Sequence, residues 1–324
     1  TMKVIFNQGV NKIDISGLRA LAPDVDFVET HTADDVAREI GDADSLSITN
    51  RVYLADMVKA VNENAKTLKW INFRTSGIDK ALKHGGFLPG TVVTNATGLS
   101  APTLSEHAFS LFMFLARNFR ATEEASTRHD WIRDGVSPSV FSFAGRTMAI
   151  LGMGQIGQSM ARKAKAFEMK VIAVSRDYKP DDSVDEVFPR ERVKEALAQA
   201  DAVLISMPSI PETHGFMDAD KLSAMKKSAY LVNIARGALV NEPDLIAACK
   251  SGQIAGAGLD VTVEEPTPAD SPLWDVPNIV LTPHIGGVGD HTPDRQFARI
   301  ARNIELYQAG KPLEFTVDWE SMVD

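Results

Sequence analysis

The chain has 324 residues, a net charge of −9 and 44% apolar residues. This length suggests two domains, each long enough to bury a core of its own. A sequence pI of about 5.3 means that the chain repels phosphate backbones, which argues against a nucleic-acid partner.

The single cysteine, Cys249, excludes a disulfide within the chain and fits a reducing compartment. We interpret it as a small core residue. Residues 3–6 form a strand-like segment, and no basic region followed by an apolar stretch comes before it. We therefore expect no signal peptide and a cytoplasmic location. The most apolar helical stretch, residues 108–116, is too short to cross a bilayer, so we expect no membrane partner.

The first hundred residues alternate short apolar strands with polar helical stretches. This βα alternation predicts a parallel sheet covered on both faces. No glycine fingerprint follows the first strand, because Asn7-Gln8-Gly9 does not match one, so we expect this domain to hold no dinucleotide. The strands are expected at residues 3–6, 26–29, 45–49, 69–72 and 91–94, and two of the helices at 32–40 and 54–61.

Two loops of small residues follow the last two of these strands. They read Arg74-Thr-Ser-Gly-Ile-Asp79 and Asn95-Ala-Thr-Gly98. Small residues at strand ends can present backbone N–H groups to an anion. Ordinary tight turns explain the same residues equally well.

Residues 102–117 predict a long buried helix. We interpret Glu106 and His107, in its first turns, as structural residues that either cap the helix or bridge between domains. Residues 120–142 are mixed in character and predict an excursion outside either sheet. Such an excursion is either a dimer arm or a surface loop.

The most informative segment is a glycine-rich turn between an apolar run, residues 148–151, and a helical run, residues 155–167. Gly152 permits a tight turn, Gly154 lets the backbone approach a pyrophosphate, and Gly157 lets helix and strand pack closely. The N-terminus of the helix offers free N–H groups to phosphates. The segment therefore predicts a dinucleotide site, and the alternative is a glycine-rich turn that binds nothing.

A second βα series begins at this turn. Its six expected strands match the number in a complete doubly wound dinucleotide domain. Apolar residues then recur at helical spacing in residues 292–308, and Gly310 and Pro312 end that helix. The six strands are expected at residues 148–151, 170–174, 202–206, 230–234, 256–259 and 278–281.

Reactive side chains follow the last three strands of this series. They are Arg236, Glu265 and His284, and ligands of open parallel sheets bind beyond the carboxyl ends of the strands. A guanidinium fixes a carboxylate by paired hydrogen bonds, and an imidazole moves the proton of a carbonyl/hydroxyl pair while a carboxylate orients it. The three residues therefore predict an oxidoreductase site. A metal site needs more ligands than converge here, so we expect none.

Six segments of the sequence, given at the end of this paragraph, together resemble the D-isomer-specific 2-hydroxyacid dehydrogenases, including the glyoxylate/hydroxypyruvate reductases. The resemblance extends along nearly the whole chain. The resemblance implies two α/β domains with doubly wound parallel sheets. A Rossmann NAD(P)-binding domain, residues 102–287, would be inserted into a flavodoxin-like substrate domain, residues 1–101 completed by 288–324. It also implies an active site in the cleft between the domains and a homodimer. The matching segments are residues 76–79, 143–157, 207–213, 233–240, 258–266 and 281–287.

The resemblance assigns roles to individual residues. His284 is similar to the family's acid/base, Glu265 to its partner and Arg236 to the substrate anchor. Glu264 is adjacent, but Glu265 directly precedes Pro266, as the family's catalytic acid does. The loop at Ser76 and Gly77 is similar to the one that holds the substrate carboxylate, together with Arg236 and His284. The implied cofactor contacts are Gly152, Gly154, Gln155, Ile156, Gly157, Ser175, Arg176, Pro208, Thr213, Ile234, Ala235, Arg236, Asp260, His284 and Gly286.

One position departs from the pattern of NAD-using members, which carry an Asp at the end of the second strand. The glycine turn places this position at Ser175, and Arg176 follows it. An acid would repel a 2′-phosphate, whereas Ser and Arg would bind it. We therefore predict a preference for NADP(H), with NAD(H) possible as a second cofactor. In the rival interpretation, Asp177 holds the ribose of NAD.

The predicted function is reduction of a small 2-oxo acid, such as glyoxylate or hydroxypyruvate, to the D-2-hydroxy acid. Phosphoglycerate, formate and phosphite dehydrogenases are the alternatives within the same fold. Regulated phosphoglycerate enzymes fit less well, because little sequence follows the helix that ends at residue 308. A dinucleotide-sensing binding protein, similar to corepressors of this fold, is the alternative outside enzymes.

Overall fold

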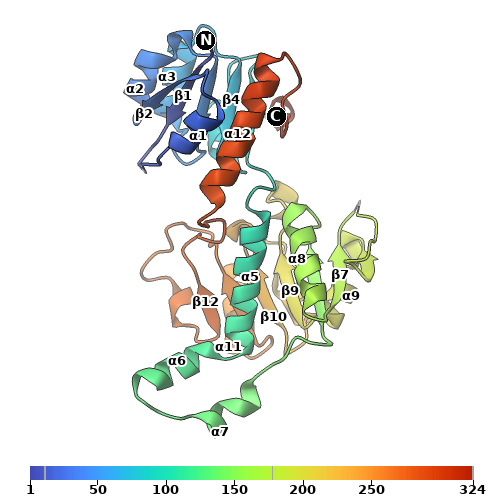
Figure 1. Cartoon of the computed structure of the whole chain (residues 1–324). Helices are drawn as coiled ribbons and strands as arrows, with labels where there is room; N and C mark the ends of the chain where they lie inside the picture. The colour runs from blue at the N-terminus through green and yellow to red at the C-terminus, as the bar shows by residue number, and fades with distance from the viewer. Residues whose placement is uncertain (11, 177, 323–324) are drawn as a thin grey trace. The chain divides into compact units, whose positions relative to one another are not determined.

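The computed structural model describes residues 1–10, 12–176 and 178–322. The chain divides into two compact units, Thr1–Leu99 with Gly289–Asp324, and Ser100–Val288. The junctions at 99/100 and 288/289 differ by two residues and one residue from the expected boundaries at 101/102 and 287/288. Figure 1 follows the chain through both units.

The described residues of the first unit form a five-stranded parallel sheet with the order β2-β1-β3-β4-β5. This order is that of flavodoxin-like folds, which confirms the expected fold class. The strands are β1 Lys3–Asn7, β2 Asp26–Thr30, β3 Ser45–Ile48, β4 Trp70–Phe73 and β5 Val92–Thr94. The helices are α1 Ser16–Leu21, α2 Ala33–Glu39, α3 Ala55–Asn64, α4 Asp79–Lys83 and α12 Thr292–Gln308, with 3-10 turns η1 Ile40–Asp42 and η7 Glu320–Met322.

Alternation along the strands divides the core of this unit between the two faces of the sheet. Ile5 and Ile71 point to the face covered by α2 and α3. Phe6 and Trp70, one position away, point to the opposite face, which α1 and α12 cover. The helix α12 has the predicted bounds, and its apolar stripe, which includes Phe297, is buried in this second layer. Successive strand residues therefore serve separate cores, as expected for a sheet covered on both faces.

The described residues of the second unit form a seven-stranded parallel sheet with the order β12-β11-β10-β9-β6-β7-β8. The predicted number of six was too low, because β8 was missed. This edge strand has three residues, Glu-Val-Phe, of which the first two are only half-buried, so no apolar run marks it. The strands are β6 Thr147–Leu151, β7 Lys170–Val174, β8 Glu186–Phe188, β9 Ala202–Ile205, β10 Tyr230–Asn233, β11 Gly256–Leu259 and β12 Ile279–Leu281.

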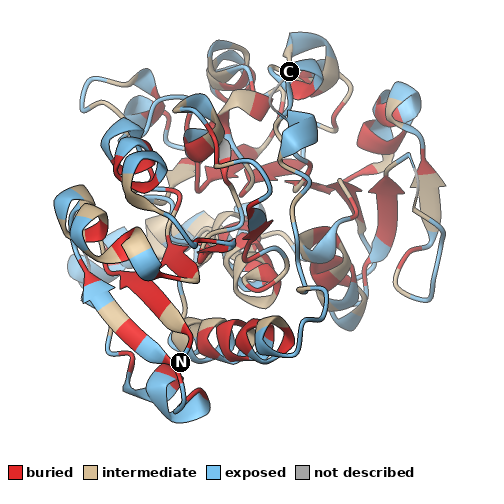
Figure 2. Ribbon diagram, turned by 90° about the horizontal axis from the view of Figure 1, so that it is seen from above, coloured by how far each residue is buried: buried red, intermediate tan, exposed pale blue. Residues whose placement is uncertain are grey.

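With β8 included, six of these strands follow the 3-2-1-4-5-6 order of a Rossmann domain, and β12 extends the sheet beyond them. The helices α5 and α8 pack on one face, and α9, α10 and α11 pack on the other. The strands are almost continuously buried, as Figure 2 shows. The helices are α5 Ala101–Ala116, α6 Phe119–Thr127, α7 Arg133–Val136, α8 Gln155–Ala166, α9 Val193–Gln199, α10 Ala219–Ser223 and α11 Glu242–Lys250, with 3-10 turns η2 Ser137–Ser139, η3 Arg190–Arg192, η4 Pro211–Thr213, η5 Gly237–Leu239 and η6 Pro272–Asp275.

The expected excursion contains α6, α7 and η2, which extend away from the sheet of their own unit (Figure 1). Arg120 lies at the start of this excursion. Its guanidinium donates to the carbonyls of Pro277 at 2.5 Å and Ile279 at 2.9 Å, which ties the excursion to the start of β12. Trp131, farther along, is 92% exposed. No helix among the described residues has the length and apolar character needed to cross a membrane.

Candidate active site

The glycine turn joins β6 to α8 as predicted. Gly152 has a φ of +100°, and a Cβ there would stand 2.7 Å from the backbone of Met207, at the end of β9. A Cβ on Gly157 would overlap the carbonyl oxygen of Gly152. Both positions therefore require glycine because backbone approaches backbone. Gln155 and Ile156 form the first turn of α8 between them.

Gly154 differs from its two neighbours in the motif. It is the N-cap residue of α8, its φ of −71° and ψ of −167° suit any residue, and a Cβ there would meet nothing within 4 Å. The protein itself therefore does not require glycine at this position. Open space beside the free N–H groups of a helix N-terminus is the arrangement that a pyrophosphate needs.

Ser175 and Arg176, the residues predicted to select the cofactor, follow the end of β7. The N–H of Ser175 donates to the carbonyl of Phe188 in β8 at 3.0 Å, so the missed edge strand anchors this position. Ser175 is half-buried and Arg176 is exposed. Asp177, on which the rival interpretation depends, lies outside the described residues.

The loop after β9 carries two of the residues expected at the cofactor. Pro208 is exposed at the edge of the sheet, but the Thr213 side chain is completely buried. Its hydroxyl donates to the carbonyls of Pro208 and Ile210, both at 2.9 Å, and accepts from the N–H of Ile210 at 2.9 Å. Thr213 therefore closes the loop through its side chain.

Arg236 follows β10 at the carboxyl edge of the sheet. Ile234 is buried and Ala235 half-buried, whereas Arg236 is exposed. One guanidinium nitrogen, Nη1, donates to the carbonyl of Ala235 at 2.7 Å. This bond holds the guanidinium against the backbone of the preceding residue, and the other N–H donors of the planar fork stay available for a carboxylate.

Glu265 and His284 form a pair, although 19 residues separate them. His284 Nδ1 lies 2.8 Å from Glu265 Oε2. The second oxygen, Oε1, accepts from the N–H of Thr262 at 3.4 Å. The His284 and Glu265 side chains are 49% and 38% exposed. The pair is therefore fixed in orientation yet open to solvent, as a group that exchanges protons with a substrate needs to be.

The backbone of His284 has a φ of +54°, a left-handed conformation that is uncommon for residues other than glycine. Its N–H donates to the carbonyl of Asp260 at 2.9 Å. The carboxylate of Asp260 accepts from the N–H groups of Ile285 at 3.0 Å and Gly286 at 2.8 Å. Asp260 therefore holds three consecutive residues of the His284 loop, which maintains the strained conformation.

Two side chains complete the surroundings of the Asp260 carboxylate. The Thr282 hydroxyl donates to Oδ1 at 2.6 Å, and His107 Nε2 lies 2.9 Å from the Thr282 oxygen and 3.3 Å from Oδ1. Burial raises the pKa of Asp260, but these donors together with the N–H groups of the loop hold its pKa below the ordinary value of 3.8. A Cβ on Gly286 would lie 2.8 Å from Oδ2, so glycine there leaves room for the carboxylate.

This network changes the interpretation of three predicted residues. Asp260 and Gly286, which were expected at the cofactor, are bonded to each other, the Asp260 carboxylate accepting from the N–H of Gly286 within the His284 loop. The side chain of His107 contacts Thr282 and Asp260, both in its own unit, so it supports this network. The positioning role of Asp260 was missed. Its only sequence signal was a charged residue directly after the buried strand β11.

Ser76 and Gly77 lie in the first unit, in the loop after β4. Asn95 Nδ2 donates to the carbonyl of Ser76 at 2.7 Å, and the Thr75 hydroxyl donates to the carbonyl of Gly77 at 3.1 Å. The carbonyls are thus bonded. Within the described residues, the N–H groups of Ser76 and Gly77 have no acceptor in the protein, which is compatible with an anion-binding loop.

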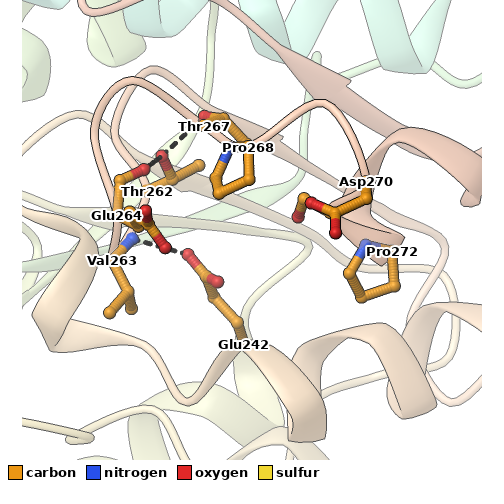
Figure 3. Close-up of a pocket in the computed structure, with 9 residues that line it drawn as sticks. Glu242, Thr262, Val263, Glu264, Thr267, Pro268, Asp270 and Pro272 are labelled. Carbon is orange, nitrogen blue, oxygen red and sulfur yellow. Dashed lines mark hydrogen bonds between the residues drawn. The ribbon is translucent and has the colours of Figure 1, made fainter.

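A pocket of about 350 Å³ lies along the loop that carries Glu265 (Figure 3). Its lining includes the carboxylates of Glu242, Glu264 and Asp270, and Glu242 accepts from the N–H of Val263 at 2.6 Å. None of the three candidate catalytic residues lines it. No group of metal ligands occurs among the described residues. The pocket is therefore separate from the pair of Glu265 and His284.

Comparison with known proteins identifies the family. The model of the NAD binding domain of the D-isomer specific 2-hydroxyacid dehydrogenases matches residues 109–286. The glyoxylate reductase of Pyrococcus furiosus is 34% identical over 256 residues, which cover 78% of this chain and 76% of that one.

Two solved structures share the fold over almost the whole length. A D-isomer specific 2-hydroxyacid dehydrogenase family protein from Aeromonas salmonicida has a TM-score of 0.85 and 29% identity, covering 98% of this chain and 99% of its own. The NADPH-dependent glyoxylate/hydroxypyruvate reductase of Sinorhizobium meliloti, in complex with NADP and sulfate, has a TM-score of 0.80 and 26% identity, covering 98% of both chains. The chain therefore belongs to the D-isomer specific 2-hydroxyacid dehydrogenases, which use a nicotinamide dinucleotide to interconvert small 2-oxo and 2-hydroxy acids.

Proposed function

We propose that the protein reduces a small 2-oxo acid to the D-2-hydroxy acid with NADPH. His284 is the acid/base, Glu265 its partner and Arg236 the substrate anchor. The observation that carries this proposal is the 2.8 Å pair of Glu265 and His284, the latter on a loop that Asp260 holds in a strained conformation. The pair lies in the same unit as the glycine turn, whose open space at Gly154 fits a dinucleotide.

The hydrogen bond to Glu265 determines how His284 acts. Glu265 accepts from Nδ1–H, so the other ring nitrogen, Nε2, faces away from the carboxylate and towards the substrate oxygen. The imidazolium donates its Nε2 proton as the carbonyl oxygen gains charge, and Glu265 balances the positive charge before the transfer. The bound nicotinamide supplies the hydride.

Arg236 and the loop at Ser76 and Gly77 recognise the carboxylate of the substrate. A guanidinium presents parallel N–H donors that match the two oxygens of a carboxylate. One N–H group of the Arg236 guanidinium donates to the carbonyl of Ala235, and the others stay available. Its position directly after β10 places it at the carboxyl edge of the sheet, where ligands of this fold bind. The N–H groups of Ser76 and Gly77 supply further neutral donors.

The preference for NADPH rests on Ser175 and Arg176. Ser175 gives a 2′-phosphate a hydroxyl donor in place of a repelling carboxylate, and the exposed Arg176 gives it a full positive charge. The NADPH dependence of the Sinorhizobium meliloti reductase is in line with this preference. The test is the ratio of kcat/KM with NADPH to that with NADH. A strong preference for NADH would overturn this part of the proposal.

The function is tested with a spectrophotometric panel of 2-oxo acids, including glyoxylate and hydroxypyruvate. We expect His284→Ala to reduce kcat by about 10²- to 10⁴-fold, the usual contribution of a positioned acid/base. Arg236→Ala raises KM for the 2-oxo acid, because the paired donors that hold the substrate carboxylate are lost. Full activity of both variants, or cofactor binding by the wild type without turnover of any 2-oxo acid, would contradict the proposal.

A further inference from the structure

Arg74 is a buried cation in the first unit, directly after β4. It is 5% exposed, and its guanidinium lies over the ring of Phe6, 4.1 Å from the ring centre. Burial lowers the pKa of Arg74 to about 10, so the side chain is still charged at neutral pH. Within the described residues, no carboxylate lies within 4 Å of the guanidinium to form an ion pair.

The partners of this guanidinium are almost all backbone carbonyls. Nη2 donates to the carbonyl of Asn7 at 2.7 Å, and Nη1 donates to the carbonyl and hydroxyl of Ser47 at 3.0 and 3.3 Å. Asn7 ends β1, and Ser47 is the penultimate residue of β3. In the sheet order β2-β1-β3-β4-β5, the gap between β1 and β3 is the topological switch point, where doubly wound folds bind their ligands. The guanidinium therefore bridges the two strands that border this position.

One nitrogen of the Arg74 guanidinium has no partner among the described residues. The Nε atom is buried and has no hydrogen bond, and carbonyl dipoles offset only part of a full charge. An uncompensated buried charge is unfavourable unless another charge balances it. The first residues after Arg74 are those of the 75–78 loop, where the N–H groups of Ser76 and Gly77 have no acceptor among the described residues. An anion bound to this loop would supply the missing negative charge.

We propose that Arg74 is a positioning residue that gives the 75–78 loop the positive charge it needs to bind the substrate carboxylate. This inference rests on the proposed function. Arg74 does not touch the substrate, because its guanidinium is enclosed by β1, β3 and Phe6. Its positive charge acts on the loop through its electrostatic field. Because the charge is buried, salt screens this field little. Arg74 also fixes the loop through the carbonyls of the two neighbouring strands.

Two substitutions separate the charge of Arg74 from its shape. Arg74→Gln removes the charge, and Arg74→Lys keeps it while losing the planar fork. Arg19→Gln is the matched control, because Arg19 also lies over a phenylalanine, Phe27, and donates to its carbonyl, but is half-exposed and paired with Glu29. The measurements are KM and kcat for glyoxylate with NADPH, the Kd of oxalate by calorimetry on the NADPH complex, and the Kd of NADPH.

We expect Arg74→Gln to raise both KM and the oxalate Kd by about tenfold or more, which corresponds to about 1.4 kcal/mol. In this variant kcat changes by less than about threefold, and the NADPH Kd is unchanged. Arg74→Lys restores most of the substrate and oxalate affinity, and Arg19→Gln behaves like the wild type. If Arg74→Gln does not fold, as judged by circular dichroism and thermal unfolding, a folded Arg74→Lys with wild-type KM supports the proposal.

Three outcomes overturn it. They are unchanged KM and oxalate Kd in Arg74→Gln, equal loss of affinity in the Gln and Lys variants, and failure of both variants to fold. Each would mean that the Arg74 side chain supports the structure of the loop and does not supply it with positive charge. Failure of the proposed function looks different, because the wild type itself would then turn over no 2-oxo acid, whatever the variants bind.

Discussion

Alanine substitutions at two glycines of the turn after β6 separate a residue kept for the ligand from one kept for the fold. Gly154→Ala places a methyl group in open space, and the φ and ψ of Gly154 are allowed for alanine. Losing a glycine at an N-cap costs about 1 kcal/mol at most, and the reduced freedom of the unfolded chain offsets roughly 0.4–1 kcal/mol of this. We therefore expect the stability of Gly154→Ala to stay close to that of the wild type.

Gly157→Ala is the matched variant, because it adds the same methyl group three residues farther along. Its Cβ overlaps the carbonyl oxygen of Gly152, and neither backbone can move without shifting α8 from β6. Overpacking of this kind costs about 1–3 kcal/mol or more. For a unit of this size, each kcal/mol lowers the Tm by roughly 2–4 °C. We expect a clear loss of thermal stability in Gly157→Ala.

For cofactor affinity, we expect Gly154→Ala to be the more affected of the two variants. The methyl group of Gly154→Ala fills the space through which a pyrophosphate reaches the N–H groups of α8, so the Kd for NADPH rises by about tenfold or more, or 1.4 kcal/mol. The assays are thermal unfolding by circular dichroism without cofactor and titration of NADPH by fluorescence. Wild-type NADPH affinity in a folded Gly154→Ala would refute the reasoning, and so would a fall in its Tm as large as that of Gly157→Ala.

Three further predictions concern the residues around the candidate site. Asp260→Asn leaves the buried N–H of Gly286 facing an amide NH₂ group, which costs about 1–3 kcal/mol. Because the folded-state pKa of Asp260 is lowered, its charge stabilises the fold above the ordinary pKa of 3.8 and this contribution is lost as the pH falls. Urea unfolding should therefore show a difference from the wild type that is largest near neutral pH and shrinks below about pH 4. Ser175→Asp lowers kcat/KM with NADPH and not with NADH, and equal losses with both cofactors would contradict the selector role. Glu265→Gln keeps the hydrogen bond to His284 but not the charge, so kcat falls while the NADPH Kd stays constant, and an unchanged kcat would remove Glu265 from the mechanism.

The sequence predicted most of the fold because the signals were local. Strand residues such as Ile5 and Phe6 serve the cores on opposite faces, and the apolar spacing in residues 292–308 gave the bounds of α12. The edge strand β8 was missed because three residues, two of them half-exposed, carry no periodic signal. Its position matters, since it anchors Ser175.

The order of residues along the chain predicted which residues form the candidate site, but it did not predict which of them are in contact. Strand ends indicated that Arg236, Glu265 and His284 share one edge of a sheet, but not that Asp260 holds the His284 loop. The hydrogen bond between His107 and Thr282 joins residues 175 positions apart, and no local pattern encodes such a contact. Thr213 shows a second limit of local patterns. A motif match cannot show that the hydroxyl already forms hydrogen bonds within its own loop.

The two units solve the problem of holding an anion beside a parallel sheet in different ways. In the second unit, α8 has 12 residues, and its aligned peptide dipoles give the glycine turn a partial positive charge. In the first unit, the 75–78 loop leads into α4, which has only five residues and offers little dipole. The loop after β4 therefore needs another source of positive charge. We infer that Arg74, buried at the switch point one residue before that loop, supplies it.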